Sequence, residues 1–298
     1  MTAGHVSSTL LVPLDGSELA ESALAYAKLV AAPDTSYVLL RVVDGGSAGE
    51  AAEAAAEASL RASARLLGDT AKVSFVSDAG DPATVIVEQA VNRGASAIVM
   101  ATHGRGAIGR WLHGSVADRV ARTTPVPVLI LRGGDDSGVT PNELRRVLLP
   151  YDGSEVARGA IPAAMDIALA KGIPVHVLTA VDVSSLAPVS VPGAAMPMSG
   201  DVYEEVYDEL VSQARSEAEA AAAILHDRGV AATTEVRVGP PAIAIEDVLR
   251  TGDLVVLSSH GRTGVQRWLL GSVSEQLVRS APGPVLLVPV AGRETASA

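Results

Sequence analysis

The stretch TLLVPLDGSELAESAL, Thr9 to Leu24, places a short apolar run directly before an Asp-Gly-Ser turn and a helix-forming segment. A strand, a tight turn and a helix in this order are typical of α/β folds. The same arrangement returns as RVLLPYDGSEVARGAI, Arg146 to Ile161. The spacing between the two copies is too long for the repeat unit of a solenoid, so it indicates a duplicated domain.

Other segments repeat in the same order. VLLRVVD at 38–44 matches VHVLTAVD at 175–182, GDPA at 80–83 matches GPPA at 239–242, and the apolar run 124–132 matches 281–290. We therefore predict one domain at 1–133, a Gly/Asp-rich linker at 134–143 and a second domain at 144–298. The second copy is longer, mainly through a Pro-, Gly- and Met-rich insert at 184–200. A lid over the second site and an unstructured loop are both compatible with this composition.

Composition narrows the class of protein. The 298 residues carry a formal net charge of −11, which argues against a general nucleic-acid binder. Hydrophobic residues make up 48% and aromatic ones 3%, so the cores must consist of Ala, Val, Leu and Ile. There is no cysteine for disulfides or thiolate chemistry, and no apolar run reaches the ~18 residues of a membrane span. We expect no membrane association and a cytoplasmic location.

Helical and strand patterns alternate along each copy. In the first copy, strands are expected at 9–14, 36–43, 72–77, 97–101 and 126–131, and helices at 18–32, 49–67, 83–93 and 115–122. Strands that are apolar throughout and separated by helices indicate a parallel sheet covered on both faces. The predicted fold class is α/β, with two tandem doubly wound, Rossmann-like domains of five parallel strands each.

Ligands of such sheets bind beyond the carboxyl ends of the strands, where the strand order switches. The side chains expected at that edge are Asp15, Asp44 and His103 in the first copy, and Asp152, Asp182 and His260 in the second. Two acid-free loops, THGRGAIGRWLHGS at 102–115 and SHGRTGVQRWLLGS at 259–272, follow the fourth strands. Both end where a helix is expected to begin. Glycine-spaced amides at a helix N-terminus suit a phosphate group.

These loops carry the spacing Gly, nine residues, Gly-Ser: Gly104 with Gly114-Ser115, and Gly261 with Gly271-Ser272. In this spacing and in nearly its whole length, the chain resembles tandem universal stress proteins, and its loops resemble those of the nucleotide-binding members. Ala101 and Ser258 stand where the family motif has a leading glycine.

The resemblance implies an adenine nucleotide, ATP or else AMP or ADP. Mg²⁺ can accompany a triphosphate, held by the phosphate oxygens and water. It places the nucleotide on two sets of residues. The first site comprises Pro13, Leu14, Asp15, Val42, Ala101, His103, Gly104, Arg105, Gly114, Ser115 and Val116. The second comprises Pro150, Tyr151, Asp152, Ala180, Ser258, His260, Gly261, Arg262, Gly271, Ser272 and Val273. It also implies that the final strands pair antiparallel between the two domains, with a homodimer of chains as a further level of assembly and an unidentified protein partner.

Each of these features also has a purely structural interpretation. The Gly-Ser pairs are helix N-caps in that interpretation, and Ser272 with Glu275 forms a capping box. The two Asp-Gly-Ser tripeptides are then ordinary strand-to-helix turns. Packing of the loops is the expected role of His103, His260, Trp111 and Trp268.

No enzyme motif is recognisable in the chain. A P-loop, a dinucleotide fingerprint, a Cys/His metal cluster and a nucleophile–base pair are all missing, so no catalytic residue or metal ligand is predicted. Three hypotheses stay open: a nucleotide-binding regulatory protein, which we favour, a nucleotide-free scaffold of the same fold, and a slow ATPase.

Overall fold

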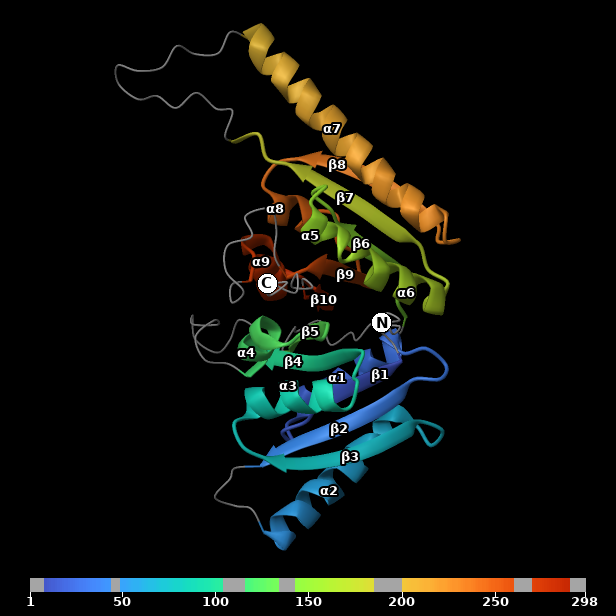
Figure 1. Ribbon diagram of the computed structural model, residues 1–298, viewed down its shortest axis with the longest axis vertical. Coiled ribbons are helices and arrows are strands. Elements are labelled where there is room, and N and C mark those ends of the chain that lie inside the picture. Colours follow the sequence, from blue (N-terminus) through green and yellow to red (C-terminus); the bar gives the residue numbers. More distant parts are fainter. Residues whose placement is uncertain are drawn as a thin grey trace, which may run out of the picture.

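The computed structural model describes residues 8–43, 49–103, 116–133, 143–184, 200–259 and 270–289. Within them, both copies form open sheets with helices on both faces (Figure 1). The predicted fold class is confirmed. The linker residues 134–142 and the insert residues 185–199 lie outside the described residues.

The first domain follows the predicted alternation of strands and helices. Its described elements are β1 (Thr9–Pro13), α1 (Glu18–Val30), β2 (Ser36–Val43), α2 (Glu50–Ala64), the 3-10 turn η2 (Arg65–Leu67), β3 (Lys72–Ala79), α3 (Pro82–Asn92), β4 (Ala97–His103), α4 (Val116–Thr123) and β5 (Val128–Gly133). The predicted helix 49–67 ends as an α-helix at Ala64 and tightens into 3-10 geometry for its last turn. The strand predicted at 97–101 continues to His103.

The second domain repeats the order with two changes. Its described elements are β6 (Arg146–Pro150), α5 (Glu155–Arg158), α6 (Ile161–Lys171), β7 (Val175–Val181), α7 (Gly200–His226), β8 (Ala232–Val238), α8 (Pro241–Glu246), β9 (Asp253–Ser258), α9 (Ser272–Ser280) and β10 (Val285–Val288). The single helix α1 of the first domain corresponds here to the pair α5 and α6. Gly159 and Pro162 account for the break, because proline lacks the amide that would continue the hydrogen-bond ladder.

The strands form one ten-stranded sheet in the order β3-β2-β1-β4-β5-β10-β9-β6-β7-β8. Strands pair in parallel within each half. The strand order reverses direction between β1 and β4 in the first domain, and between β6 and β9 in the second. These two points are where a doubly wound sheet opens a crevice for a ligand.

The two halves join through the last strand of each. β10 pairs antiparallel with β5, with Leu286 opposite Leu129 and Val285 opposite Ile130. The predicted antiparallel pairing of the final strands is confirmed. Both leucines are buried, so each apolar edge strand covers the other instead of facing water.

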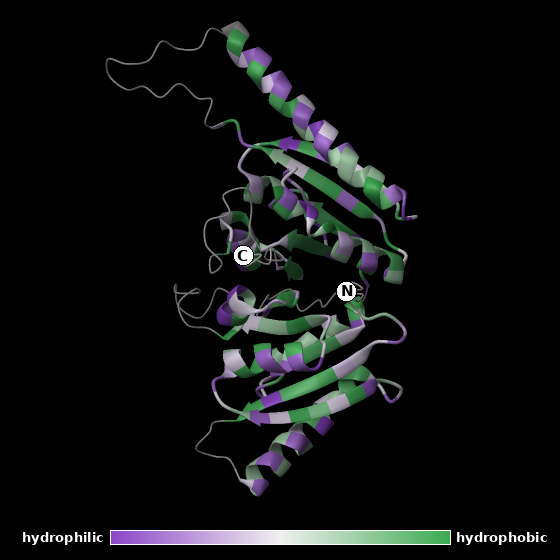
Figure 2. Ribbon diagram, viewed as in Figure 1, coloured by the Kyte–Doolittle hydropathy of each residue, from purple (hydrophilic) through white to green (hydrophobic). Residues whose placement is uncertain are grey.

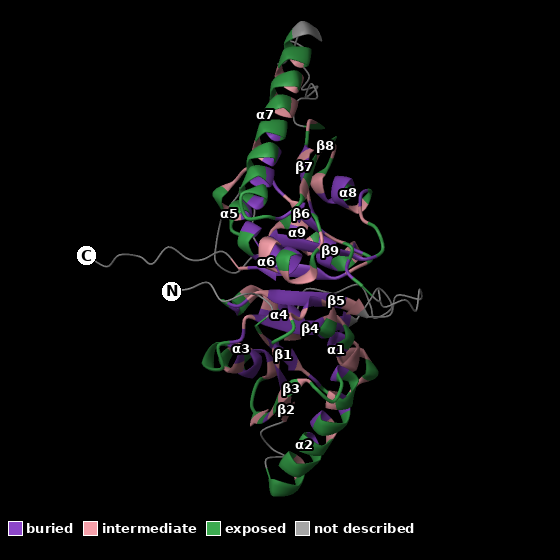
Figure 3. Ribbon diagram, turned by 90° about the vertical axis from the view of Figure 1, so that its right-hand side faces the viewer, coloured by how far each residue is buried: buried purple, intermediate pink, exposed green. Residues whose placement is uncertain are grey.

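The core lies on both faces of the sheet and contains mostly small and aliphatic side chains, as the composition predicted. Every residue of β9 is buried, which is typical of a strand covered on both sides. Figure 3 shows the buried strands between helices whose outer faces are exposed, and Figure 2 shows the matching separation of hydrophobic strands from hydrophilic helix surfaces. Among the described residues, Tyr37 and Tyr151 are the buried aromatic side chains.

The helix α7 is the longest of the described helices. It spans 27 residues, and its N-terminal part runs past the edge of the sheet (Figure 1). Its C-terminal half packs on the sheet through buried alanines such as Ala214, Ala218 and Ala221, with an exposed opposite face. Within the described residues, no helix combines the length and the apolar character needed to cross a membrane.

A buried ion pair fastens the amino ends of β6 and β9. The guanidinium of Arg146 donates to both carboxylate oxygens of Asp253, at 2.8 and 2.7 Å, and also to the carbonyl of Val248 at 2.7 Å. The side chain of Asp253 is 2% exposed. The first domain uses a neutral contact at the same place, where the Ser96 hydroxyl bonds to the amide and carbonyl of Thr9.

Replacing Arg146 with alanine should lower the free energy of unfolding by about 3 kcal/mol, because it leaves the Asp253 carboxylate buried without its cation. The adjacent Arg145→Ala is the matched control, since the ion pair of Arg145 with Glu143 is about 70% exposed and should contribute less than about 0.5 kcal/mol. Urea unfolding of both variants measures the difference. Equal midpoint shifts would contradict this account of the pair.

In the first domain, a further ion pair joins the start of α3 to α4. Asp81 caps α3 by accepting from the Thr84 amide, and Arg119 of α4 donates to both oxygens of its carboxylate, at 2.8 and 2.6 Å. The hydrogen bond from Arg119, together with those from Thr84, holds the pKa of Asp81 far below its ordinary value of 3.8. Pro240 occupies the corresponding position before α8 and provides no side-chain cap.

Because the pKa of Asp81 is depressed in the folded protein, its contribution to stability is complete above pH 3.8 and is lost as the pH falls further. Asp81→Asn keeps an acceptor for the cap but removes the charge. This variant should therefore lose less stability than the wild type between neutral pH and strongly acidic pH. Thermal unfolding across that range tests it, with Asp34→Asn, whose carboxylate is 98% exposed, as the control that should follow the wild type.

Candidate functional site

The Asp-Gly-Ser turn after β1 has a fixed geometry. Ser17 is the N-cap of α1, and its hydroxyl accepts from the Ala20 amide at 3.1 Å. One carboxylate oxygen of Asp15 accepts from the amide and the hydroxyl of Ser17, at 2.9 and 2.6 Å. Gly16 lies between them with φ +83°, a conformation that favours glycine.

The second domain builds the same turn after β6. Ser154 caps α5 through a 3.0 Å bond from the Ala157 amide, and Asp152 Oδ1 accepts from the amide and hydroxyl of Ser154, at 3.0 and 2.6 Å. Gly153 has φ +76°. Both tripeptides are thus the strand-to-helix turns of the structural interpretation. The same turns also present an aspartate at the carboxyl edge of each sheet.

The carboxyl group of Asp15 stays ionised to a lower pH than usual. Burial acts to raise its pKa, but the hydrogen bonds from the hydroxyl and amide of Ser17 and the nearby charge of Arg41 outweigh it, so the net pKa is lowered. Asp182 also has a lowered pKa, because the side chain and amide of Ser184 hydrogen-bond to it.

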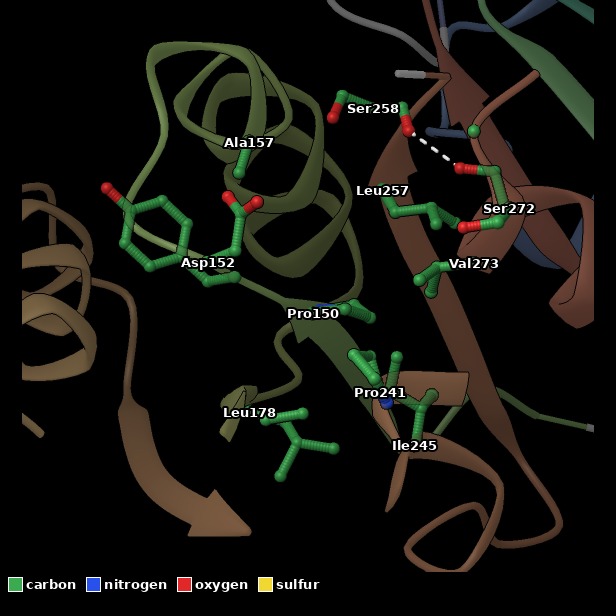
Figure 4. A pocket seen from close by; sticks show the side chains of 14 residues that line it. Pro150, Asp152, Ala157, Leu178, Pro241, Ile245, Leu257, Ser258, Ser272 and Val273 are labelled. Carbon is green, nitrogen blue, oxygen red and sulfur yellow. Dashed lines mark hydrogen bonds between the residues drawn. The ribbon is translucent and has the colours of Figure 1, made fainter. Parts of the chain in front are cut away.

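In the second domain the predicted residues surround a pocket of about 320 Å³ at the carboxyl ends of β6, β7 and β9 (Figure 4). Eight residues predicted from the sequence line it. They are Pro150, Tyr151, Asp152, Ala180, Ser258, Gly271, Ser272 and Val273. Asp152 and Ser272 lie on different sides of the cavity in Figure 4, with apolar side chains between them.

Sequence reasoning missed the rest of the lining. These residues are Ala157, Leu178, Pro241, Ile245, Leu257 and Ser274. In the sequence they are indistinguishable from core residues, since Leu178, Leu257 and Ile245 continue the apolar periodicity of their strands and helix. Pro241 belongs to the repeated GPPA segment, as Ala157 and Leu178 belong to the other repeated segments, but repetition alone does not mark a pocket residue.

The start of α9 differs from the predicted capping box. The N-cap residue is Gly271, which has no side chain to cap with, and Ser272 is the first helical residue. Glu275 instead pairs with Arg279 one turn later. The capping box is therefore wrong. The opening turn of α9 has no side-chain cap, so its backbone amides are not satisfied by Ser272 or Glu275.

Two contacts hold this helix start against β9. The hydroxyl of Ser274 donates to the carbonyl of Ser258 at 3.0 Å, and the Gly271 amide donates to the carbonyl of Ser259 at 2.9 Å. The first of these is the dashed line in Figure 4. The amino end of α9 is thereby fixed at the wall of the pocket.

In the first domain the described site residues also meet at the carboxyl edge. Pro13 ends β1, Val42 lies near the end of β2, Ala101 and His103 end β4, and Val116 begins α4. Leu14 follows β1 and bonds through its amide to the Leu40 carbonyl at 2.8 Å. The remaining predicted residues, together with Asp44, Trp111 and Trp268, lie outside the described residues: Gly104, Arg105, Gly114, Ser115, His260, Gly261 and Arg262.

Residues 7–132 and 143–289 both match the family model described as the universal stress protein family. The chain belongs to this family. Each matched segment coincides with one of the two repeats, so the chain is a tandem of universal stress protein domains.

Individual relatives agree with this assignment. Universal stress protein MJ0531 of Methanocaldococcus jannaschii is 32% identical over 162 residues, covering 53% of this chain and 86% of that protein. Universal stress protein Rv2005c of Mycobacterium tuberculosis is 30% identical over 209 residues, covering 69% of this chain but only 65% of its own length. A universal stress protein from Archaeoglobus fulgidus shares the fold, with a TM-score of 0.67 at 22% identity, covering 95% of this chain and 98% of that one.

The turns that carry the two aspartates depend on their serine caps. Ser154→Ala should lower the free energy of unfolding by about 1 kcal/mol, because it removes both the cap of α5 and the hydroxyl that Asp152 accepts from. Ser154→Thr keeps the hydroxyl and should recover most of the loss. Ser216→Ala, on the exposed face of α7, is the control and should leave stability unchanged or slightly higher. Urea midpoints that fall equally in both alanine variants would rule out the capping role.

Proposed function

We propose that this universal stress protein is an adenine-nucleotide-binding regulatory protein with one site in each domain. The observation that carries the proposal is the pocket of the second domain, which gathers eight separately predicted residues at the switch point between β6 and β9. That is the place where doubly wound sheets bind their ligands.

The lining has the division of chemistry that a nucleotide requires. Apolar side chains, among them Leu178, Pro241 and Ile245, suit the faces of a planar base. Asp152 offers a carboxylate to ribose hydroxyls. At the other side, the uncapped first turn of α9 supplies backbone amides and the positive end of the helix dipole for phosphate. Mg²⁺ would then be held mainly by phosphate oxygens and water.

The replacement of the leading motif glycine by Ala101 and Ser258 does not argue against nucleotide binding. Ala101 lies within β4 and Ser258 within β9, so both have extended backbone that any residue adopts. Neither position needs the positive φ that would favour glycine. The replaced glycine and the missing capping box therefore do not favour the nucleotide-free scaffold over the nucleotide-binding protein.

Under this proposal, bound nucleotide biases the surface that the protein offers to a partner, and hydrolysis is not required. Denaturing the purified protein and separating the released small molecules tests for ATP, ADP or AMP carried through purification. Titration calorimetry should then give two sites per chain.

Filling the second pocket should remove one of these sites. Ala180→Trp places a bulky side chain against the pocket wall and should reduce the stoichiometry from two nucleotides to one without changing the fold. Ala220→Trp, on the exposed face of α7, should keep two. A wild-type protein that releases no nucleotide and binds none at millimolar concentration would overturn the proposal in favour of the scaffold.

A further inference from the structure

The two Asp-Gly-Ser turns have side chains of opposite charge packed against them. The strand register shows which residues of the two domains correspond. Pro13 pairs with Leu40 and Pro150 with Leu178, so Arg41 in β2 corresponds to Thr179 in β7. A cation in one domain is thus replaced by a short neutral side chain in the other.

In the first domain the guanidinium of Arg41 lies over the turn. Its Nη1 donates to the carbonyl of Leu14 at 3.4 Å. A Cβ built on Gly16 would lie 2.8 Å from the same nitrogen. The positive charge is therefore in contact with the glycine that follows Asp15, the residue assigned to the ribose.

In the second domain a carboxylate takes that place. Thr179 is 3% exposed, and its hydroxyl has no hydrogen-bond partner among the described residues. Glu217 of α7 covers the turn instead: its carboxylate lies so close to Gly153 that a Cβ on this residue would collide with it. Gln213, one turn earlier, donates to one carboxylate oxygen of Glu217 at 2.9 Å and helps to hold it there.

We propose that Arg41 and Glu217 give the two nucleotide sites different preferences for ligand charge. This inference rests on the proposed function. The cation beside Asp15 favours the more highly charged ATP at the first site. The Glu217 carboxylate against Gly153, the residue after Asp152, disfavours ATP, so the second site has a higher AMP-to-ATP preference than the first.

The physical basis is Coulomb interaction across a partly buried turn. Each charge lies against the glycine that directly follows the aspartate, at the edge of the proposed site, so a phosphate bound there lies within roughly a Debye length of it. Without bound Mg²⁺, ATP carries roughly twice the negative charge of AMP, so the repulsion from Glu217 and the attraction to Arg41 act more strongly on Mg²⁺-free ATP, the form used in the measurements below. Because part of this interaction passes through solvent, it should weaken as salt concentration rises.

The experiment measures one site at a time in the full chain. Val42→Trp closes the first site, since Val42 corresponds to Ala180, and Ala180→Trp closes the second. In the Val42→Trp background, Glu217→Gln should tighten ATP roughly fivefold at low salt and AMP by less than about twofold. Glu219→Gln, which removes an exposed carboxylate on the same helix, is the matched control and should change neither the ATP nor the AMP affinity.

The first site should respond in the opposite direction. In the Ala180→Trp background, Arg41→Gln should weaken ATP roughly fivefold with a smaller effect on AMP, and Arg41→Lys should restore most of the preference. Melting temperatures identify any variant that fails to fold, for which Arg41→Met and Glu217→Met remove the same charge and give the same test.

The possible results separate the two proposals. An ATP-to-AMP ratio that Glu217→Gln changes no more than Glu219→Gln, or that does not respond to salt, overturns the charge-preference inference while nucleotide binding stands. A wild-type chain that binds neither nucleotide at either site overturns the proposed function itself.

Discussion

The antiparallel contact between β5 and β10 is the constraint on which the rest of the architecture depends. Each domain ends in an apolar strand that would be an exposed edge if the domain stood alone. Pairing these strands satisfies their backbone groups and buries Leu129 and Leu286 together. Two open sheets thereby become one sheet of ten strands, with a core that is continuous across the joint.

Side chains reinforce this joint where helices of one domain reach the other. Arg132, close to the end of β5, donates to the Arg279 carbonyl near the end of α9 at 2.8 Å. Lys171 at the end of α6 donates to the Lys28 carbonyl in the last turn of α1 at 3.4 Å, and burial lowers the pKa of Lys171. Cations at helix C-termini satisfy carbonyls that lack an intrahelical partner. The domains are therefore joined by helix ends as well as by strands.

The sequence was sufficient to predict features that repeat or follow a local period. The duplicated Asp-Gly-Ser turns located both strand-to-helix junctions, and alternation of apolar strands with helices gave the fold class. The full length of α7 was also readable in principle, because Tyr203, Val206, Tyr207 and Leu210 have helical spacing. The segment borders the Pro- and Gly-rich insert, whose composition hides where the helix begins.

Other features depend on contacts that no local pattern encodes. The capping box at Ser272 failed because the cap position is set by how the chain enters α9, and the structure places Gly271 there. The apolar wall of the pocket could not be separated from core residues, since Leu178 and Leu257 differ from them only in lying at the sheet edge. The contact of Glu217 with Gly153 joins residues far apart in the chain.

Duplication explains why the two copies fasten the same fold differently. The amino ends of the central strands are held by Ser96 and Thr9 in one domain and by Arg146 and Asp253 in the other. Either solution satisfies the buried polar groups, so the fold does not select between them. The fold likewise does not select the side chains beside the two turns, yet Arg41 and Glu217 lie against Gly16 and Gly153, the glycines that follow the aspartates of the candidate sites. Under the proposed function, divergence that is neutral for the sheet would change the affinity for a charged ligand, and this is where two copies of one domain would acquire different roles.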